Sequence, residues 1–132
     1  MKLDHLGIAV KSLESSLHFY RDLLGLEAGH TEEVAAEKVR VAMLALGDTR
    51  VELVEATSAD SAIARYVAKR GEGLHHIAIQ VPDLTAAIAK LKSAGARLVN
   101  ETPGIGAGGH RYVFVHPQSA GAGGVLLELV EG

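Results

Sequence analysis

The segment His5-Leu-Gly-Ile-Ala-Val10 recurs as His76-Ile-Ala-Ile-Gln-Val81, and this repeat decides the fold. The two copies lie 71 residues apart, the distance from position 5 to position 76. Each copy begins with a histidine and then alternates branched apolar residues with small or polar ones, which is typical of a β-strand with one buried face. The chain is therefore predicted to contain one structural unit twice.

A helix signal follows each copy at the same spacing. Ser12 and Asp83 are both good N-caps, because their side-chain oxygens accept hydrogen bonds from the free amides of a first helical turn. The apolar residues after each cap recur with the spacing of one helical face. Gly25 and Gly95 stand where a left-handed residue ends a helix. Each half is thus predicted to run strand, helix and then further strands.

The remaining strand signals complete both halves. We predict strands at about 3–10, 26–33, 38–46 and 49–55 in the first half, and at about 74–81, 97–100, 110–116 and 124–130 in the second. The modules are about 1–57 and 73–132, within a single domain of 132 residues. A helix at about 59–70, capped by Ser58 or Asp60 and ended by Gly71, links them. The glycine-rich stretches 103–109 and 119–124 are predicted to be loops.

The composition excludes several classes of function. A formal charge of −3 and a pI near 6.1 give no basic footprint for nucleic acid. The chain has no cysteine, so any metal must be held by histidine, carboxylate or carbonyl groups. We find no stretch of transmembrane length and no signal peptide, and we expect a cytoplasmic protein.

Strand alternation separates four polar residues from the apolar faces. In the repeated strands, His5 and His76 share a face with small residues, while the branched residues point to the other side. Glu52 and Glu128 stand between branched apolar residues in the matching segments Val51-Glu-Leu-Val-Glu55 and Leu127-Glu-Leu-Val-Glu131. Two imidazoles and two carboxylates suit Zn, Co, Ni, Mn or Fe, and they leave coordination positions open. The duplication therefore predicts a metal site formed by His5, Glu52, His76 and Glu128.

Several motifs give the chain a family resemblance. The stretches that carry it are Asp4-His-Leu-Gly-Ile-Ala-Val10, Gly47-Asp-Thr-Arg-Val-Glu-Leu53, Gly71-Glu-Gly-Leu-His-His-Ile-Ala78, His116-Pro117 and Gly124-Val-Leu-Leu-Glu-Leu129. Over nearly its whole length the chain resembles the vicinal oxygen chelate (glyoxalase/bleomycin-resistance) superfamily, and within it the methylmalonyl-CoA epimerases.

The resemblance implies an α+β fold in which two tandem βαβββ modules form a curved mixed sheet around a metal-binding cleft, usually in a homodimer. It assigns metal ligation to His5, Glu52, His76 and Glu128, with Co, Zn, Ni or Mn as the ion. It implies interconversion of the 2R and 2S forms of a CoA thioester, methylmalonyl-CoA, through an enolate that the metal stabilises. Glu128 is then the first acid–base group and Glu52 the second. Some epimerases carry another acidic residue where this chain has Val41.

Two alternatives remain open at this point. One is a glyoxalase I-type lactoylglutathione lyase, which would use the same four ligands for a similar proton transfer. The other is a non-catalytic binding protein of the bleomycin-resistance kind, which usually lacks the full set of metal ligands. The segment Leu74-His-His-Ile-Ala78 favours the epimerase over the lyase.

Overall fold

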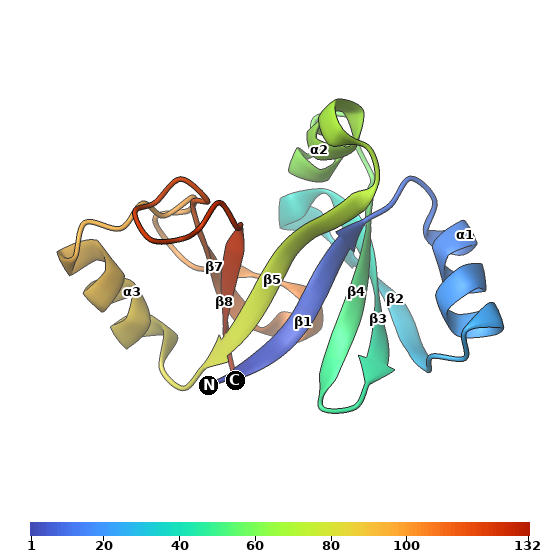
Figure 1. The fold of residues 1–132 in the computed structure, drawn as a ribbon, viewed down its shortest axis with the longest axis horizontal. Coiled ribbons are helices and arrows are strands. Elements are labelled where there is room, and N and C mark those ends of the chain that lie inside the picture. Colours follow the sequence, from blue (N-terminus) through green and yellow to red (C-terminus); the bar gives the residue numbers. More distant parts are fainter. The chain divides into compact units, whose positions relative to one another are not determined.

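A computed structural model describes residues 1–132. The chain forms two compact units. The N-terminal unit comprises residues 5–75, and the C-terminal unit comprises residues 1–4 and 76–132. None of the helices is long and apolar enough to span a membrane. Figure 1 shows the ribbon of residues 1–132 with the helices and most of the strands labelled.

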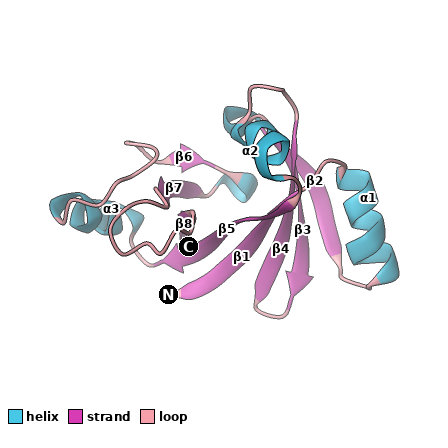
Figure 2. Ribbon diagram, turned by 45° about the horizontal axis from the view of Figure 1, so that its top comes forward, coloured by secondary structure: helices cyan, strands magenta, loops and turns pink.

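The N-terminal unit follows the predicted order of one strand, one helix and three strands. Its strands are β1 (Lys2–Ala9), which enters the unit at His5, β2 (Ala28–Val34), β3 (Val39–Leu46) and β4 (Thr49–Ala56). Its helical segments are α1 (Leu13–Leu17), the π-helix η1 (His18–Leu23), the 3₁₀ turn η2 (Ala35–Glu37) and α2 (Ala62–Arg70). The strand order is β2-β3-β4-β1, in which β1 pairs with β4 in parallel and the other pairs are antiparallel (Figure 2). The order of elements predicted for the first half, strand, helix and three strands, is confirmed.

The C-terminal unit repeats this arrangement. It contains β5 (Gly73–Val81), α3 (Leu84–Ser93), β6 (Gly104–Ile105), the 3₁₀ turn η3 (Ala107–Gly109), β7 (Arg111–Val115) and β8 (Leu127–Glu131). The strand order is β5-β8-β7-β6, with β5 parallel to β8 and antiparallel pairs elsewhere. The parallel pair again joins the first and last strands of the module.

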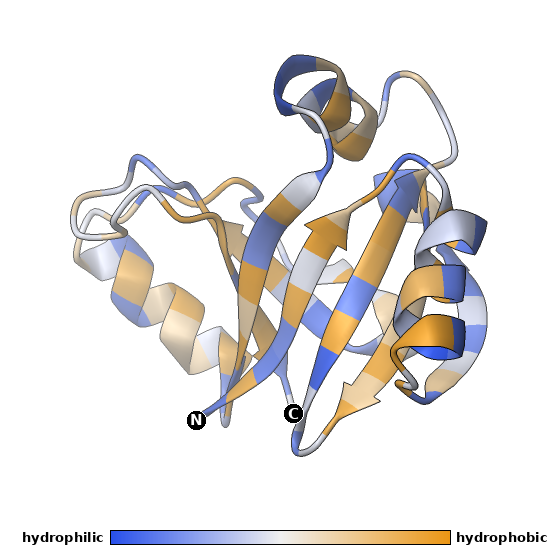
Figure 3. Cartoon of the chain, turned by 45° about the vertical axis from the view of Figure 1, so that its right-hand side comes forward, coloured by the Kyte–Doolittle hydropathy of each residue, from blue (hydrophilic) through white to orange (hydrophobic).

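One face of each sheet packs on a helix, and we call it the helix face. Ile8 of β1 and Val10, which directly follows the strand, pack with Leu13 and Leu17 of α1 in one core. The matching core of the C-terminal unit is built from residues of β5, α3, β7 and β8, namely Val81, Leu84, Ile88, Val113, Val115 and Leu129. Hydrophobic and hydrophilic residues alternate in bands along the strands (Figure 3), as the period of two predicts.

The predicted caps of the first and third helices are confirmed. Ser12 accepts a hydrogen bond from the amide of Ser15 at 3.2 Å, and Asp83 accepts one from the amide of Ala86 at 3.0 Å. The linking helix is different, because its cap is Ser61, which accepts from the amide of Ala64 at 3.0 Å. The prediction of Ser58 or Asp60 was wrong, since these two side chains hydrogen-bond to each other instead.

The predicted strand at 97–100 is absent as a regular strand. Leu98 forms one isolated bridge with Val115, and the side chain of Asn100 accepts the amide of Phe114 at 2.8 Å. The side-chain oxygen of Asn100 thus accepts the hydrogen bond from the Phe114 amide that a backbone carbonyl would accept in a regular β-ladder. The strand that pairs regularly with this edge of β7 is the two-residue β6, within the stretch predicted to be a loop.

The start of β8 also differs from the prediction. The stretch 119–124 is irregular, as predicted, and β8 begins at Leu127 instead of residue 124. Gly124 has a φ angle of 76°, which is left-handed and differs from the extended backbone of a regular strand.

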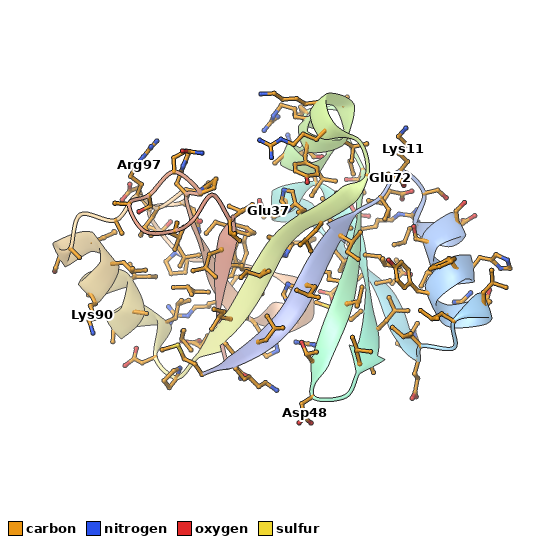
Figure 4. All side chains as sticks on the ribbon, in the orientation of Figure 1. Lys11, Glu37, Asp48, Glu72, Lys90 and Arg97 are labelled. Carbon is orange, nitrogen blue, oxygen red and sulfur yellow. The ribbon has the colours of Figure 1, made fainter.

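A hydrogen bond connects the segment after α2 with the segment after β1. The carboxylate of Glu72 accepts a hydrogen bond from the backbone amide of Lys11 at 2.7 Å, and both residues are labelled in Figure 4.

Each helix face carries one arginine–glutamate pair at an equivalent position. Arg40 lies opposite Glu55 and bonds to it at 2.5 Å, and Glu55 also accepts the amide of Leu13 at 3.1 Å. In the other unit Arg111 bonds to Glu131 at 2.6 Å and to Thr85 of α3 at 3.3 Å. Both pairs therefore tie the end of the last strand to the start of the helix.

The Glu55 carboxylate should stabilise the fold in a pH-dependent way. Burial alone would raise the pKa of Glu55, but the hydrogen bonds from Arg40 and from the Leu13 amide outweigh it, so the pKa lies below its usual range. A depressed folded-state pKa gives stability that is present above about pH 4.3 and is lost as the pH falls through the folded value. Glu55→Gln should lower the free energy of unfolding by about 1 kcal/mol at pH 7.

Urea unfolding at pH 7 and at pH 3 checks this expectation. The difference between Glu55→Gln and the unmodified protein should shrink at the lower pH. Glu131→Gln removes the equivalent ion pair in the other unit, and its effect should also shrink at the lower pH, because the hydrogen bond from Arg111 lowers the pKa of Glu131. Equal destabilisation by Glu55→Gln at both pH values would contradict the assigned role of the charge.

Candidate functional site

The first candidate pair lies on the face of the N-terminal sheet opposite α1, which we call the ligand face. His5 is on β1 and Glu52 is on β4, and the two residues are 3% and 7% exposed. The Nε2 atom of His5 lies 3.5 Å from Oε1 of Glu52. A histidine and a carboxylate distant in sequence are thus brought together inside the unit.

The second candidate pair has the same composition in the C-terminal unit. His76 is on β5 and Glu128 is on β8, and they are 5% and 9% exposed. The Nε2 atom of His76 lies 3.2 Å from Oε1 of Glu128. Each predicted histidine therefore meets the predicted glutamate of its own module.

Strand register explains why both pairs form. In the parallel pairing of β1 with β4, Glu52 is the partner of Gly7, two residues after His5. In the pairing of β5 with β8, Glu128 is the partner of Ala78, two residues after His76. Since residues two apart share a strand face, the histidine and the glutamate point to the same side in both units. The small residues Gly7 and Ala78 leave room beside the carboxylates.

The chemistry of these residues fits a divalent cation. Imidazole nitrogen and carboxylate oxygen bind first-row cations at about 2.0–2.2 Å, so two donors on one ion lie roughly 3–3.5 Å apart. The separations within the two pairs match this range. Buried carboxylates are costly without compensating charge, which a cation supplies. His5, Glu52 and His76 are buried residues of the kinds that hold a divalent metal ion.

The ligand face of the N-terminal unit is apolar beside Glu52. Met43 is the partner of Glu52 across β3, and Val41 is the partner of Val54 two residues along. Val41 is 3% exposed and carries no group that can exchange a proton. The position where some epimerases have an acidic residue is thus a packed aliphatic side chain in this protein.

The ligand face of the C-terminal unit carries aromatic residues that the sequence analysis missed. Phe114 is the partner of Glu128, and its ring meets the His76 ring edge-to-face with centroids 5.6 Å apart. Tyr112 lies two residues away on the same face, with its ring centroid 5.4 Å from that of Phe114. The alternation in Arg111-Tyr-Val-Phe-Val115 already indicates that Tyr112 and Phe114 share a strand face. Only the pairing of β7 with β8 shows that this face is the one that carries Glu128.

Comparison with known proteins gives the family. Residues 4–114 match the Glyoxalase/Bleomycin resistance protein/Dioxygenase superfamily. The chain belongs to this superfamily, and the predicted fold class is confirmed.

Within the superfamily the predicted resemblance to methylmalonyl-CoA epimerases is also confirmed. The chain is 38% identical over 130 residues to the ethylmalonyl-CoA/methylmalonyl-CoA epimerase of Cereibacter sphaeroides, covering 97% of this chain and 96% of the relative. The crystal structure of methylmalonyl-CoA epimerase from Mycobacterium tuberculosis is similar with a TM-score of 0.92 and 40% identity, covering 98% of this chain and 87% of that one. A variant of the Streptomyces coelicolor methylmalonyl-CoA epimerase, in complex with 2-nitronate-propionyl-CoA, has a TM-score of 0.92 at 38% identity, covering 100% of this chain and 94% of that one.

Metal binding should be visible as thermal stabilisation. Adding Co²⁺ or Zn²⁺ to metal-stripped protein at about 100 times the Kd should raise the Tm by roughly 10 °C, because the ion binds the folded state. A chelator should reverse the shift. His5→Ala and His76→Ala should each reduce it strongly, as measured by scanning calorimetry.

His18→Ala is the matched control for these variants. His18 also lies beside a carboxylate, with Nδ1 3.3 Å from Oδ2 of Asp22, but its side chain is 65% exposed on η1. Its replacement should leave the metal-induced shift intact. A Tm that does not respond to any first-row divalent ion would overturn the assignment of the buried pairs to metal binding.

Proposed function

We propose that this chain is a divalent-metal-dependent methylmalonyl-CoA epimerase, which interconverts the 2R and 2S forms of its substrate. The observation that carries the proposal is the pair of buried His–Glu sets in identical registers, in a chain similar over its full length to methylmalonyl-CoA epimerases. The substrate is accordingly a CoA thioester.

The proposal includes one cation held jointly by His5, Glu52, His76 and Glu128, with Co, Zn, Ni or Mn as the ion. Two kinds of support point to joint binding. Each pair supplies one nitrogen and one oxygen, so that two pairs make the four-donor set typical of catalytic first-row metals with open positions. The repeat of the register in both modules gives the two pairs equivalent geometry.

A cation held by these four residues would supply a Lewis acid, which would make the C2 proton of a bound thioester more acidic. The protein must then remove that proton from one side and return one on the other. Glu128 is the first acid–base group in this proposal, since a carboxylate can accept the C2 proton and give it back. Its burial keeps bulk water away from the carbon during the transfer.

The second proton carrier is Glu52 in this proposal. Two carriers on opposite sides are needed, because a proton returned to the side it left restores the starting epimer. Val41 has no exchangeable proton, which leaves Glu52 as the buried carboxylate on the ligand face of the N-terminal unit. The repeat makes Glu52 the counterpart of Glu128.

A homodimer and a cytoplasmic location complete the proposal. The family resemblance implies the dimer, and the sequence prediction gives the location.

Metal stoichiometry tests joint binding. Elemental analysis after loading and desalting should find one ion per chain, because both pairs hold the same ion. Each of His5→Ala and His76→Ala should bring the content close to zero. Two ions per chain, with one lost in each variant, would show that the pairs bind separately.

Proton exchange tests the activity and the role of Glu128. The unmodified protein should incorporate solvent deuterium at C2 of methylmalonyl-CoA, and a chelator should stop it. Glu128→Gln should slow the exchange by about 10²–10⁴-fold, because the amide cannot accept the proton. Mass spectrometry of the substrate follows the label.

The control for this variant is Glu131→Gln, three residues further on β8 and on the helix face. It should exchange at close to the unmodified rate. Metal content is measured in parallel, so that loss of the ion is separated from loss of the proton carrier. Near-normal exchange by Glu128→Gln that retains its metal would refute the assignment.

A further inference from the structure

Phe114 on β7 lies beside the second candidate pair, His76 and Glu128. It is the partner of Glu128 in the antiparallel pairing of β7 with β8, and directly opposed residues share a sheet face. Its ring meets the His76 ring with centroids 5.6 Å apart and planes at 85°. This is an edge-to-face contact, the geometry that aromatic pairs favour. Phe114 thus lies opposite one proposed metal ligand and packs against the other.

The orientation of the His76 ring decides where its nitrogen points. Rotation of an imidazole about χ2 has no sharp staggered wells, so the groups around the ring have to set it. Nε2 of His76 lies 3.2 Å from Oε1 of Glu128, a separation that suits two donors on one cation. A ring packed edge-to-face on the imidazole opposes rotation away from this position, and Phe114 supplies such a ring.

Phe114 is itself held in place from the edge of the sheet. Its backbone amide donates to Oδ1 of Asn100 and its carbonyl accepts the amide of Val99, both at 2.8 Å. Its ring contacts the ring of Tyr112, with centroids 5.4 Å apart and planes at 70°. Tyr112 is buried against Gly104 of β6, where an added Cβ atom would lie 2.7 Å from Cζ of the tyrosine. The Phe114 ring is therefore supported from the side of β7 that faces away from β8.

The N-terminal unit has a methionine at the equivalent position. Met43 is the partner of Glu52, as Phe114 is the partner of Glu128, and a methionine side chain is unbranched and flexible. In this unit Nε2 of His5 lies 3.5 Å from Oε1 of Glu52. The duplication thus provides two versions of one His–Glu pair, one with a phenyl ring opposite the carboxylate and one with a thioether chain.

We propose that Phe114 is a positioning residue for His76, and that its ring strengthens the binding of a divalent cation by holding the imidazole nitrogen toward Glu128. This inference rests on the proposed metal site. Groups that orient a metal-ligating histidine typically contribute about 10–100-fold to metal affinity. Phe114 donates no electron pair to the cation in this role, so its replacement should weaken binding while all the proposed ligands remain.

The test measures the Kd of Co²⁺ and of Zn²⁺ by competition with a chelating dye. Phe114→Leu and Phe114→Met remove the ring but keep an apolar side chain, and each should raise the Kd by about tenfold or more. Phe114→Tyr retains the ring and should bind the ions as the unmodified protein does. The visible absorption bands of the Co²⁺-loaded protein report the ligand geometry, so they should change in the two variants without the ring and stay the same in Phe114→Tyr.

Two controls separate positioning from general packing. Val113→Ala opens a cavity in the core on the helix face, so it should lower the Tm of the metal-free protein and leave the Kd and the Co²⁺ bands unchanged. Met43→Leu is the matched change opposite Glu52 in the other unit, and it should change the Kd clearly less than Phe114→Leu does. An equal effect of Met43→Leu would contradict the role assigned to the ring.

The outcomes separate this inference from the proposed function. If the unmodified protein binds the ions and both Phe114→Leu and Phe114→Met bind them equally well, the inference fails and the metal site stands. An equal rise in the Kd of Val113→Ala or of Phe114→Tyr would also overturn it. If the unmodified protein binds no first-row divalent ion, the proposed metal site fails and this inference fails with it. A higher Kd in either variant without the ring, with the Kd kept in Phe114→Tyr, supports the inference whether or not the protein exchanges the C2 proton of methylmalonyl-CoA.

Discussion

The parallel register between the first and last strand of each module is the constraint on which the site chemistry depends. Gly7 faces Glu52 and Ala78 faces Glu128, and in each case the histidine lies two positions earlier. A slip of one residue would send the glutamate to the helix face, among the residues that pack on α1 or α3. The sequence neighbours of Glu52 oppose such a slip, because Val51 and Leu53 are buried in the core on the helix face.

Much of the scaffold follows from local sequence signals. The caps Ser12 and Asp83 and the order of elements were predictable. A hydroxyl or carboxylate directly before a segment with helical apolar spacing accepts a hydrogen bond from a free amide of the first turn. The four polar residues of the ligand faces could also be found, because duplication marks positions that a single strand would leave ambiguous. Their pairing within modules agrees with the alternation of the strands.

Other features depend on contacts that the sequence does not show. Asn100 uses its side chain in place of a backbone partner for Phe114, and no local pattern distinguishes that from a strand. The segment at 104–105 pairs with β7 as a strand, and its Gly104 lies against the ring of Tyr112, which belongs to a different element. Ser61 caps α2 since Ser58 and Asp60 are already bonded to each other. In each case a hydrogen bond or packing contact that the local sequence pattern does not reveal decides the structure.

The arginine–glutamate pairs show how a duplicated protein can diverge unequally. Arg40–Glu55 and Arg111–Glu131 occupy matching places on the two helix faces, whereas Met43 and Val41 on one ligand face correspond to Phe114 and Tyr112 on the other. The halves have stayed alike where they hold their helices and have become different around their carboxylates. A substitution on the ligand face of one half therefore leaves in place the ion pair that connects the last strand of that half to its helix.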